Sequence, residues 1–389
     1  MGVGAGIADM KIASACIYAL NVPFVESFRH SLSERNHSDS IIVKVTADSG
    51  ISGFGEGVPR SYVTGETCDM SVEHIKSKLL PQIVGIRLDG IAVKHALAEI
   101  NNLIPESTAT GVVVWNASRC AVELAVIDCL FRSHNLSVSV AMPPISQMVT
   151  YSGVISAGST ARVEKMAHRC KSAGFKYIKM KVSRAEDVER VAVVRQILGP
   201  AVSIRLDANT AFNQKTAIPF LKSIEKYDIA CIEQPIPRGN PSALAALRAS
   251  SPIPFMADES IVTIHDAQEL IENKAVDYFN LRLSKCGGLY KTLAIADLAR
   301  SAGIGIQLGC QVGETAILSA AGRHLAAYLK DLRFVEGSYS THLLVEDISG
   351  KAIVFGPGGR ADILTGVGLG ITICEELLDK YAENKIRVG

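Results

Sequence analysis

The sequence lacks an excess of charge of either sign. Its 389 residues include 40 Lys and Arg and 39 Asp and Glu, which leaves a formal net charge of +1 and no extended basic surface for a phosphate backbone. Long apolar runs are also missing, since none reaches the roughly 20 residues that cross a bilayer. The N-terminus has no basic-then-apolar secretory layout. We therefore expect no nucleic-acid partner, no membrane partner and a cytoplasmic location.

Paired cysteine motifs are missing as well. The nine cysteines are scattered without a C-x-x-C pair, which argues against a disulfide framework and against a zinc site. We interpret them as reduced thiols in the core. Apolar residues make up 48% of the chain and charged residues 20%, which is usual for a folded soluble protein. The length exceeds that of one ordinary hydrophobic core, so we expect two structural units.

Residues 1–140 have the composition of a compact α+β capping domain. Two segments have the β-branched residues typical of strands: Lys11–Tyr18 and Ser40–Thr46. Three segments have helical periodicity: Met70–Leu80, Gly90–Ile100 and Ala117–Ser133. Between them Val22–Arg35 is polar and Gly53–Glu66 is rich in glycine. We interpret both of these segments as mobile loops.

Residues 141–340 alternate short apolar runs with amphipathic helical stretches, a pattern typical of β/α units around a parallel sheet. The eight runs are Val149–Gly153, Tyr177–Lys181, Ser203–Asp207, Ile229–Glu233, Pro254–Asp258, Tyr278–Arg282, Gly305–Leu308 and Phe334–Glu336. We predict an α/β fold with a TIM-type (β/α) barrel of seven or eight units. Residues 341–389 are expected to return to the capping domain, complete it, and end in a helix at Thr372–Tyr381.

Three carboxylates stand at the last positions of consecutive predicted strands: Asp207, Glu233 and Asp258. In a barrel the carboxyl ends of the strands converge on one face, where these groups repel one another and require a cation. Oxygen ligands of this kind favour Mg²⁺, with Mn²⁺ as the alternative. Taken singly, each acid is better explained as a surface salt-bridge partner, but their shared spacing favours a metal site.

Two lysines, Lys179 and Lys181, lie two residues apart on the second predicted strand, so both side chains point to the same side of the sheet. Apolar residues alternate with them, which indicates that this side is the barrel interior. Beside a divalent cation and another ammonium, a lysine has its pKa lowered toward neutrality and can act as a base. The alternative is a pair of surface lysines on a frayed strand.

The same strand ends carry a family resemblance. The motifs are Lys179-Met-Lys181, Asp207-Ala-Asn209, Glu233-Gln-Pro235, Ala257-Asp-Glu-Ser260 and Lys285-Cys-Gly-Gly288. Together they resemble the muconate-lactonizing (muconate cycloisomerase), mandelate racemase-like subgroup of the enolase superfamily, over nearly the whole chain. The resemblance implies an enzyme acting on a small-molecule carboxylate, and homo-oligomers are common among such proteins.

The resemblance also implies roles for individual residues. Asp207, Glu233 and Asp258 would be the metal ligands, Lys181 the catalytic acid or base, and Lys179 its electrostatic neighbour toward the substrate carboxylate. Asn209, Gln234 and Glu259 would orient the ligands. The metal would neutralise the charge that develops when the α-proton leaves and an enediolate forms.

At the sixth strand this sequence departs from the family pattern. Arg282 stands where a second lysine belongs, and Lys285 fits the lysine that precedes the glycine pair. Arginine is essentially never deprotonated in proteins, so it cannot easily serve as the opposing base. We therefore favour a one-base reaction by Lys181, either an elimination (dehydration) or a cycloisomerisation. Arg282 would be a fixed cation for substrate, or a salt-bridge partner of Glu259 or Glu314.

Two other functions remain open. The first is a racemase or epimerase in which Lys181 works with Lys285 or with another donor. The second is a barrel that binds metal or ligand without catalysis, which the presence of Arg282 keeps in consideration.

Substrate recognition is less well marked. The Asp-x-Asp of dipeptide-epimerase relatives is absent at the eighth strand, where the chain has Glu336-Gly-Ser338, and this disfavours dipeptides. The residues that we predict to contact substrate are Arg29, His30, Tyr62, Glu314, Glu336 and Ser338, with Phe24 and Phe28 as further candidates from the cap.

Overall fold

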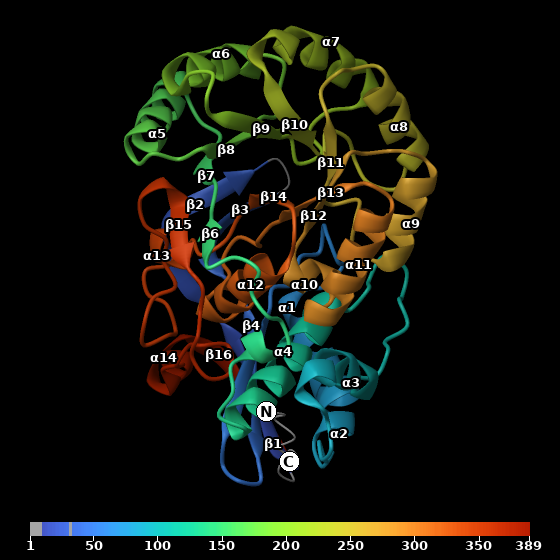
Figure 1. Cartoon of the computed structure of the whole chain (residues 1–389), viewed down its shortest axis with the longest axis vertical. Helices are drawn as coiled ribbons and strands as arrows, with labels where there is room; N and C mark the ends of the chain where they lie inside the picture. Colours follow the sequence, from blue (N-terminus) through green and yellow to red (C-terminus); the bar gives the residue numbers. More distant parts are fainter. Residues whose placement is uncertain (1–9, 31–32) are drawn as a thin grey trace.

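The computed structural model describes residues 10–30 and 33–389, apart from the side chains of Arg29, His30 and Ser33. Its centre is a parallel eight-stranded sheet whose strands follow one another in chain order (Figure 1). These strands are β7 (Gly153–Ile155), β8 (Tyr177–Lys181), β9 (Ser203–Asp207), β10 (Ile229–Glu233), β11 (Phe255–Ala257), β12 (Tyr278–Leu281), β13 (Gly305–Leu308) and β14 (Leu332–Val335). The Ser152 N–H donates to the Val335 carbonyl at 2.8 Å, which links the two ends of the sheet. The predicted barrel is confirmed.

Helices connect the strands on the outside of the barrel. They are α5 (Thr160–Ser172), α6 (Asp187–Leu198), α7 (Gln214–Ile224), α8 (Pro241–Ala249), α9 (Ile264–Glu272), α10 (Leu283–Cys286), α11 (Leu289–Ser301) and α12 (Ala316–Tyr328). Asn213 and Thr263 begin α7 and α9 with capping boxes, which satisfy amide groups that the first turn leaves free. On β8, Ile178 and Met180 are fully buried and alternate with the two lysines, as expected for neighbours on opposite faces of a strand.

The capping domain is built on a second sheet in the order β16-β1-β4-β5. Its strands are β1 (Ile12–Leu20), β4 (Ile41–Ala47), β5 (Ser52–Gly57) and β16 (Ala382–Val388), and its helices are α1 (Cys68–His74), α2 (Leu80–Ile83), α3 (Ala96–Leu103) and α4 (Asn116–Ser133). A π-helical turn, Ile75–Leu79, joins α1 to α2. The C-terminal segment returns to the cap through α14 (Glu375–Tyr381) and through β16, a strand that the sequence analysis missed.

The loop prediction for Gly53–Glu66 is wrong in its first part, because residues 53–57 form most of β5. Three glycines alternate along β5, and α4 lies directly upon them. A Cβ atom at Gly53 or Gly55 would be 2.0 Å from the α4 backbone, and one at Gly57 would be 2.1 Å from it. These glycines serve a close helix–strand approach, not flexibility.

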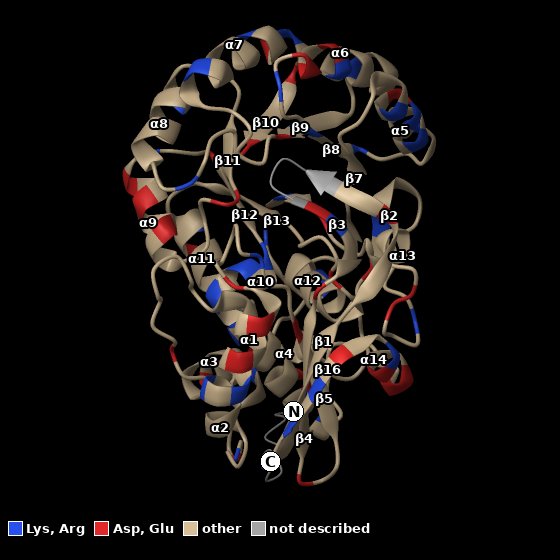
Figure 2. Cartoon of the chain, turned by 180° about the vertical axis from the view of Figure 1, so that it is seen from behind, with Lys and Arg blue, Asp and Glu red and all other residues tan. Residues whose placement is uncertain are grey.

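The prediction of a loop at Val22–Arg35 is also wrong. The backbone forms β2 (Val22–His30), which pairs antiparallel with β3 (Ser33–Ser38). Both strands lie near β7 and β8 in the two views (Figure 1, Figure 2). The Val345 N–H donates to the Pro23 carbonyl at 3.0 Å, and the Ser38 hydroxyl donates to the Gly313 carbonyl at 2.7 Å. The polar composition reflects two exposed strands that reach from the cap to the barrel.

The first barrel strand is displaced from its predicted place. Part of Val149–Gly153 forms β6 (Met148–Thr150), which pairs antiparallel with β15 (Arg360–Asp362) outside the barrel, and the barrel strand β7 follows it. Helix α13 (Ser340–Leu343) lies between β14 and β15 in the chain. The last helix begins at Glu375 instead of Thr372. No helix among the described residues is long and apolar enough to cross a membrane.

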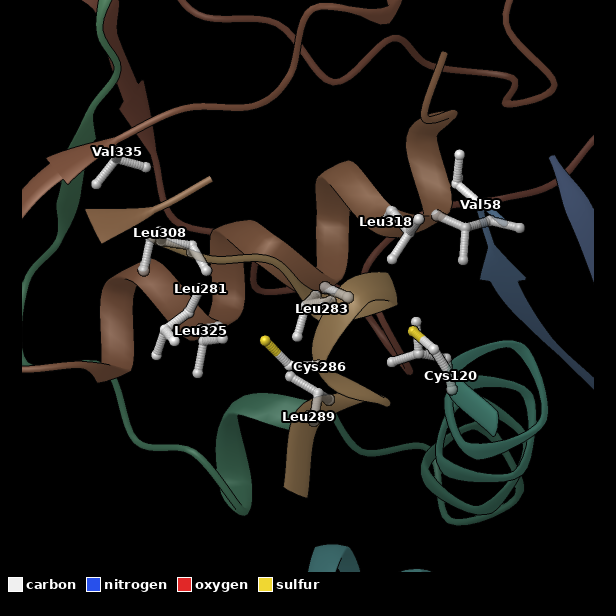
Figure 3. Packing of buried hydrophobic residues seen from close by; sticks show 14 of the residues in the cluster. Val58, Cys120, Leu281, Leu283, Cys286, Leu289, Leu308, Leu318, Leu325 and Val335 are labelled. Atoms are coloured by element: carbon white, nitrogen blue, oxygen red, sulfur yellow. The ribbon is translucent and has the colours of Figure 1, made fainter. Parts of the chain in front are cut away.

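Apolar and polar contacts fix the cap on the barrel. Val58 and Cys120 of the cap pack toward Leu283, Leu289 and Leu318 of the barrel (Figure 3). Two buried carboxylates add hydrogen bonds between the cap and the barrel. Glu56 accepts from the Thr315 and Leu318 amides at 2.8 and 3.0 Å, and Glu123 accepts from the Leu289 and Tyr290 amides at 2.5 and 3.1 Å. These amides are at the N-termini of α12 and α11, which favour negative charge.

Candidate active site

The ends of the strands bring the charged residues together. Asp207, Glu233 and Asp258 are 0%, 0% and 1% exposed. The Lys179 ammonium lies 2.7 Å from Asp207 Oδ2 and 3.0 Å from Glu233 Oε1, so it joins the first two carboxylates. Arg282 pairs with Asp258 and lies 3.7 Å from Glu233 Oε1, so it joins the second and third. The three acids therefore surround one region, as their spacing in the sequence predicts.

Lys181 lies at the wall of the pocket beside this cluster. Its Nζ is 2.6 Å from Asp207 Oδ2 and 2.5 Å from Asn209 Oδ1, and the residue is 9% exposed. The Asn209 amide nitrogen in turn donates to Glu259 Oε1 at 3.0 Å. Lys181 thus combines access to the pocket with two contacts that fix the direction of its amine.

The electrostatics of the cluster are uneven. Burial opposes the charged form of Lys179, but Asp207, Glu233 and Glu336 outweigh it and hold the Lys179 pKa well above its ordinary value. For Lys179 this direction is opposite to the lowered lysine pKa expected from the sequence, which assumed a divalent cation beside the amine. Burial, followed by repulsion from Asp207, raises the pKa of Glu233 to about 7. The negative charge at Glu233 is thus incompletely balanced by the side chains around it.

The fit of this cluster to a divalent cation rests on its donors. Within the described residues no group of three His, Cys, Asp or Glu side chains is already arranged to hold a metal, and the Lys179 and Arg282 head groups lie between the carboxylates. The donors are nevertheless hard oxygens, the type that Mg²⁺ prefers. Three of the buried oxygens that lack hydrogen-bond partners among the described residues belong to residues that line the pocket or contact Glu233: Glu259 Oε2, Asn280 Oδ1 and Gln307 Oε1. This chemistry fits a divalent cation.

Several buried polar residues orient the carboxylates. The Gln234 side-chain oxygen accepts from the backbone N–H groups of Asp258 and Ser260, each at 3.0 Å. The Asn280 and Gln307 amides donate to Glu233 at 2.8 and 3.5 Å, and neither residue was identified from the sequence. Their signal was a polar residue at an interior position of a strand that is otherwise apolar.

Glu336, predicted to contact substrate, is engaged by cations. It lies 3.1 Å from the Lys179 ammonium and pairs with Arg205, which also donates to the Ser152 hydroxyl at 3.1 Å. Arg205 was not identified from the sequence, although it stands two residues before Asp207 and therefore shares its face of β9. Glu336 is part of the charged floor of the barrel as well as of the pocket wall.

The pocket beside Lys181 has a volume of about 800 Å³. The predicted site residues that line it are Lys179, Lys181, Arg282, Asn209, Glu259, Tyr62, Glu314, Glu336 and Ser338, together with Phe28. Phe24 is buried and bridges to Leu344 instead. The side chains of Arg29 and His30 lie outside the described residues.

Lys285 is not brought to the pocket. Its side chain is fully buried, and its ammonium donates to Asp258 Oδ1 at 2.9 Å and to the Asp258 and Asn280 carbonyls at 2.7 and 2.6 Å. These three contacts use all of its donor protons. Lys285 therefore supports a metal-ligand candidate and has no proton to offer a substrate.

Arg282 and Glu314 both form hydrogen bonds with Gln311, in the loop after β13. Arg282 donates to Gln311 Oε1 at 3.1 Å as well as to Asp258, and in the described residues it forms no ion pair with Glu259 or Glu314. Glu314 accepts from the backbone N–H of Gln311 at 2.5 Å, and burial raises the pKa of Glu314 to about 8. A carboxyl group with such a pKa carries a proton at neutral pH.

Two family models match the chain. The model described as enolase C-terminal domain-like matches residues 161–377, and the model described as the mandelate racemase / muconate lactonizing enzyme N-terminal domain matches residues 13–142. The chain belongs to this family of the enolase superfamily. Its cap and barrel correspond to the two matched ranges, and the family resemblance found in the sequence is confirmed.

Relatives with known names support this assignment. The N-succinyl-L-Arg/Lys racemase of Bacillus cereus is 31% identical over 84% of this chain and 87% of the relative. A crystal structure of N-succinyl Arg/Lys racemase from that organism matches with a TM-score of 0.88 and 28% identity, over 97% of this chain and 100% of the other. The hydrophobic dipeptide epimerase of Enterococcus faecalis is 29% identical over 83% of this chain and 89% of the relative.

A third relative was solved with a metal. The dipeptide epimerase of Cytophaga hutchinsonii, in complex with Mg and the dipeptide D-Ala-L-Val, matches with a TM-score of 0.84 and 26% identity, over 97% of this chain and 100% of the other. All three relatives are named as racemases or epimerases. The comparisons therefore favour the racemase or epimerase alternative over the elimination or cycloisomerisation that the sequence analysis preferred.

Proposed function

We propose that this chain is a divalent-metal-dependent racemase or epimerase of a small-molecule carboxylate. The observation that carries the proposal is the Lys181 amine at the pocket wall, 2.6 Å from Asp207 and next to two further buried carboxylates. The names of its relatives support the reaction class, and the magnesium in the dipeptide epimerase complex supports the choice of metal.

Asp207, Glu233 and Asp258 would hold the metal, and when bound it would supply positive charge beside the carboxylate end of the substrate. Lys181, in its neutral form, takes that proton, and Asn209 keeps its amine in position. Lys179 remains a fixed ammonium beside the carboxylate end of the substrate.

Inversion also needs a proton donor on the other face of the substrate. Arg282 cannot supply one because its guanidinium does not deprotonate, and Lys285 is tied to Asp258. Glu314 lines the same pocket and carries a proton at neutral pH, so we assign the second proton transfer to Glu314. In one turnover Lys181 gains a proton from carbon and Glu314 loses one to carbon, after which both exchange with solvent.

Arg282 favours a second candidate function. If no donor acts on the other face, Lys181 alone would catalyse an elimination or a cycloisomerisation, with Arg282 as a fixed cation. The two candidates differ in the fate of the α-hydrogen.

An exchange experiment in heavy water separates the candidates. The protein is incubated with Mg²⁺ and a panel of N-acyl amino acids, dipeptides, hydroxy acids, acid sugars and unsaturated diacids, and the α-proton is followed by NMR. Deuterium incorporation with inversion supports the epimerase, whereas incorporation with retention, or loss of water, supports the one-base reaction. Lys181→Ala should abolish exchange while circular dichroism shows an unchanged fold. Exchange that survives this substitution contradicts both candidates.

A further inference from the structure

The pocket extends well beyond its charged end. Away from Lys181 and Arg282 its lining is mostly apolar, and we define this part as the apolar arm. Its residues are Met166, Cys170, Phe175, Leu343 and Phe355, and Val154, the neighbour of Lys179 across β7 and β8, borders the charged end. They come from β7, α5, the turn after α5, α13 and the segment that follows α13. The elements α5, β7 and α13 lie on the same side of the barrel in both views (Figure 1, Figure 2).

A packed set of rings forms one wall of the apolar arm. The Phe355 ring stacks on Tyr151 with centroids 5.4 Å apart, and it meets Phe175 and Tyr339 edge-on at 5.9 and 5.8 Å. Such contacts hold a ring in one orientation before a ligand arrives, which lowers the ordering cost of binding. Phe355 is only half-buried, so part of its surface remains available to the pocket.

The charges of the pocket are confined to its other end. Lys179 and Lys181 are paired with Asp207, and Arg282 is paired with Asp258. Among the described residues, those of the apolar arm carry neither a carboxylate nor an ammonium or guanidinium group, and one titratable side chain beside them is that of His342, whose ring centroid lies 5.7 Å from that of Phe355. A second charged group on the substrate would therefore lose its hydration in the arm without gaining a carboxylate, ammonium or guanidinium partner from the described residues there, which is costly. An uncharged apolar group gains free energy from the same transfer.

We propose that the substrate is a carboxylate carrying a bulky uncharged apolar group, aromatic or branched, and that the apolar arm binds this group. The inference rests on the proposed function, since the charged end of the pocket would hold the carboxylate. It sets this chain apart from the relative named N-succinyl-L-Arg/Lys racemase, whose named substrate has charged groups at both ends.

The test uses two matched pairs of probes with Mg²⁺. N-phenylacetyl-L-alanine is compared with N-succinyl-L-alanine, and N-acetyl-L-phenylalanine with N-acetyl-L-glutamate, so that the variable group is on nitrogen in one pair and on the α-carbon in the other. Affinity is measured by calorimetry and α-proton exchange by NMR. We expect the apolar member of at least one pair to bind about tenfold more tightly or better, because a phenyl group buries on the order of 100 Å².

A substitution in the arm provides the matched control. Met166→Lys, at a half-buried position of α5, should reduce or invert the preference for the apolar probe, because it adds a charge to the arm. Ala161→Lys makes the same change of charge at an exposed position of α5 that does not line the pocket, and it should leave the preference unchanged.

The outcomes separate this inference from the proposed function. Equal affinities within both pairs, a preference for the charged probes, or equal effects of the two lysine substitutions overturn the apolar arm as the binding site. If the apolar probe binds with the expected dependence on Met166 but no probe exchanges its α-proton, the inference stands and the proposed function fails. If exchange is equally fast for both members of each pair and in Met166→Lys, the function stands and the inference fails.

Discussion

Glu314→Gln tests the assignment of the second proton transfer. The glutamine keeps an oxygen to accept from the Gln311 amide, which lies 2.5 Å from Glu314 Oε1, so we expect the loop to retain its conformation. What the substitution removes is the acidic proton. General acid catalysis contributes typically about 10²- to 10⁴-fold, so inversion should slow by that factor.

The same variant should retain exchange on the Lys181 face. Lys181 can still remove the α-proton and return deuterium from solvent, which gives incorporation without inversion. The assay follows both events in one sample, with NMR for incorporation and polarimetry for inversion. Glu164→Gln, at an exposed position of α5, is the control and should change neither rate.

The pH dependence gives an independent check. Burial raises the pKa of Glu314 to about 8, so about nine-tenths of the carboxyl groups are protonated at pH 7 and few are at pH 9. Donation by Glu314 should therefore fall as pH rises through about 8. If Glu314→Gln loses exchange and inversion equally, or loses neither, Glu314 is not the donor. The scheme in which Lys181 and Glu314 carry out the two proton transfers is then refuted.

Three further predictions concern the metal and the stability of the fold. Mg²⁺ should raise the thermal unfolding midpoint of the wild type but not of Asp258→Asn, and equal shifts would argue against this metal site. Gly55→Ala would put a Cβ atom 2.0 Å from the Ala121 carbonyl oxygen and should destabilise the protein by more than about 3 kcal/mol. Gly322→Ala would put a Cβ atom where no other atom lies within 4 Å, and it should stabilise α12 by about 0.5–1 kcal/mol. Both changes are measured by denaturant unfolding. Burial raises the pKa of Glu123 from 4.5 to about 7, so the folded state binds more protons than the unfolded state between these values, and the free energy of unfolding falls as pH rises through this range. Glu123→Gln should remove up to about 3 kcal/mol of this pH dependence. An unchanged dependence of the unfolding free energy on pH would contradict this prediction.

The candidate site was predictable from sequence because each carboxylate follows a short apolar run. That pattern located Asp207 and Glu233 at the ends of β9 and β10, and it located Asp258 directly after β11. The contacts of Lys285 and Arg282 could not be predicted, since they depend on how the sixth strand turns into α10.

The errors in the fold have a common physical cause. Glycine in Gly53–Gly57 indicated a loop, but the strand needs glycine because α4 approaches its backbone. Polar residues in Val22–Arg35 also indicated a loop, but they belong to strands that expose both faces for part of their length. In both cases a tertiary contact decides the local structure, and single-sequence patterns do not contain that contact.

The loop from Gln311 to Glu314 connects the parts of the site. Arg282 donates to Gln311 Oε1 with one nitrogen of its guanidinium and to Asp258 with another, which a lysine with a single nitrogen could not do in the same way. On its other side the loop accepts from Arg60 at Val312 and from Ser38 at Gly313, and both donors belong to the capping domain. The cap, a metal-ligand candidate and the proposed donor Glu314 are therefore held by one short segment. An arginine at the sixth strand fits the proposed scheme, in which Arg282 holds this loop and Glu314 carries out the second proton transfer.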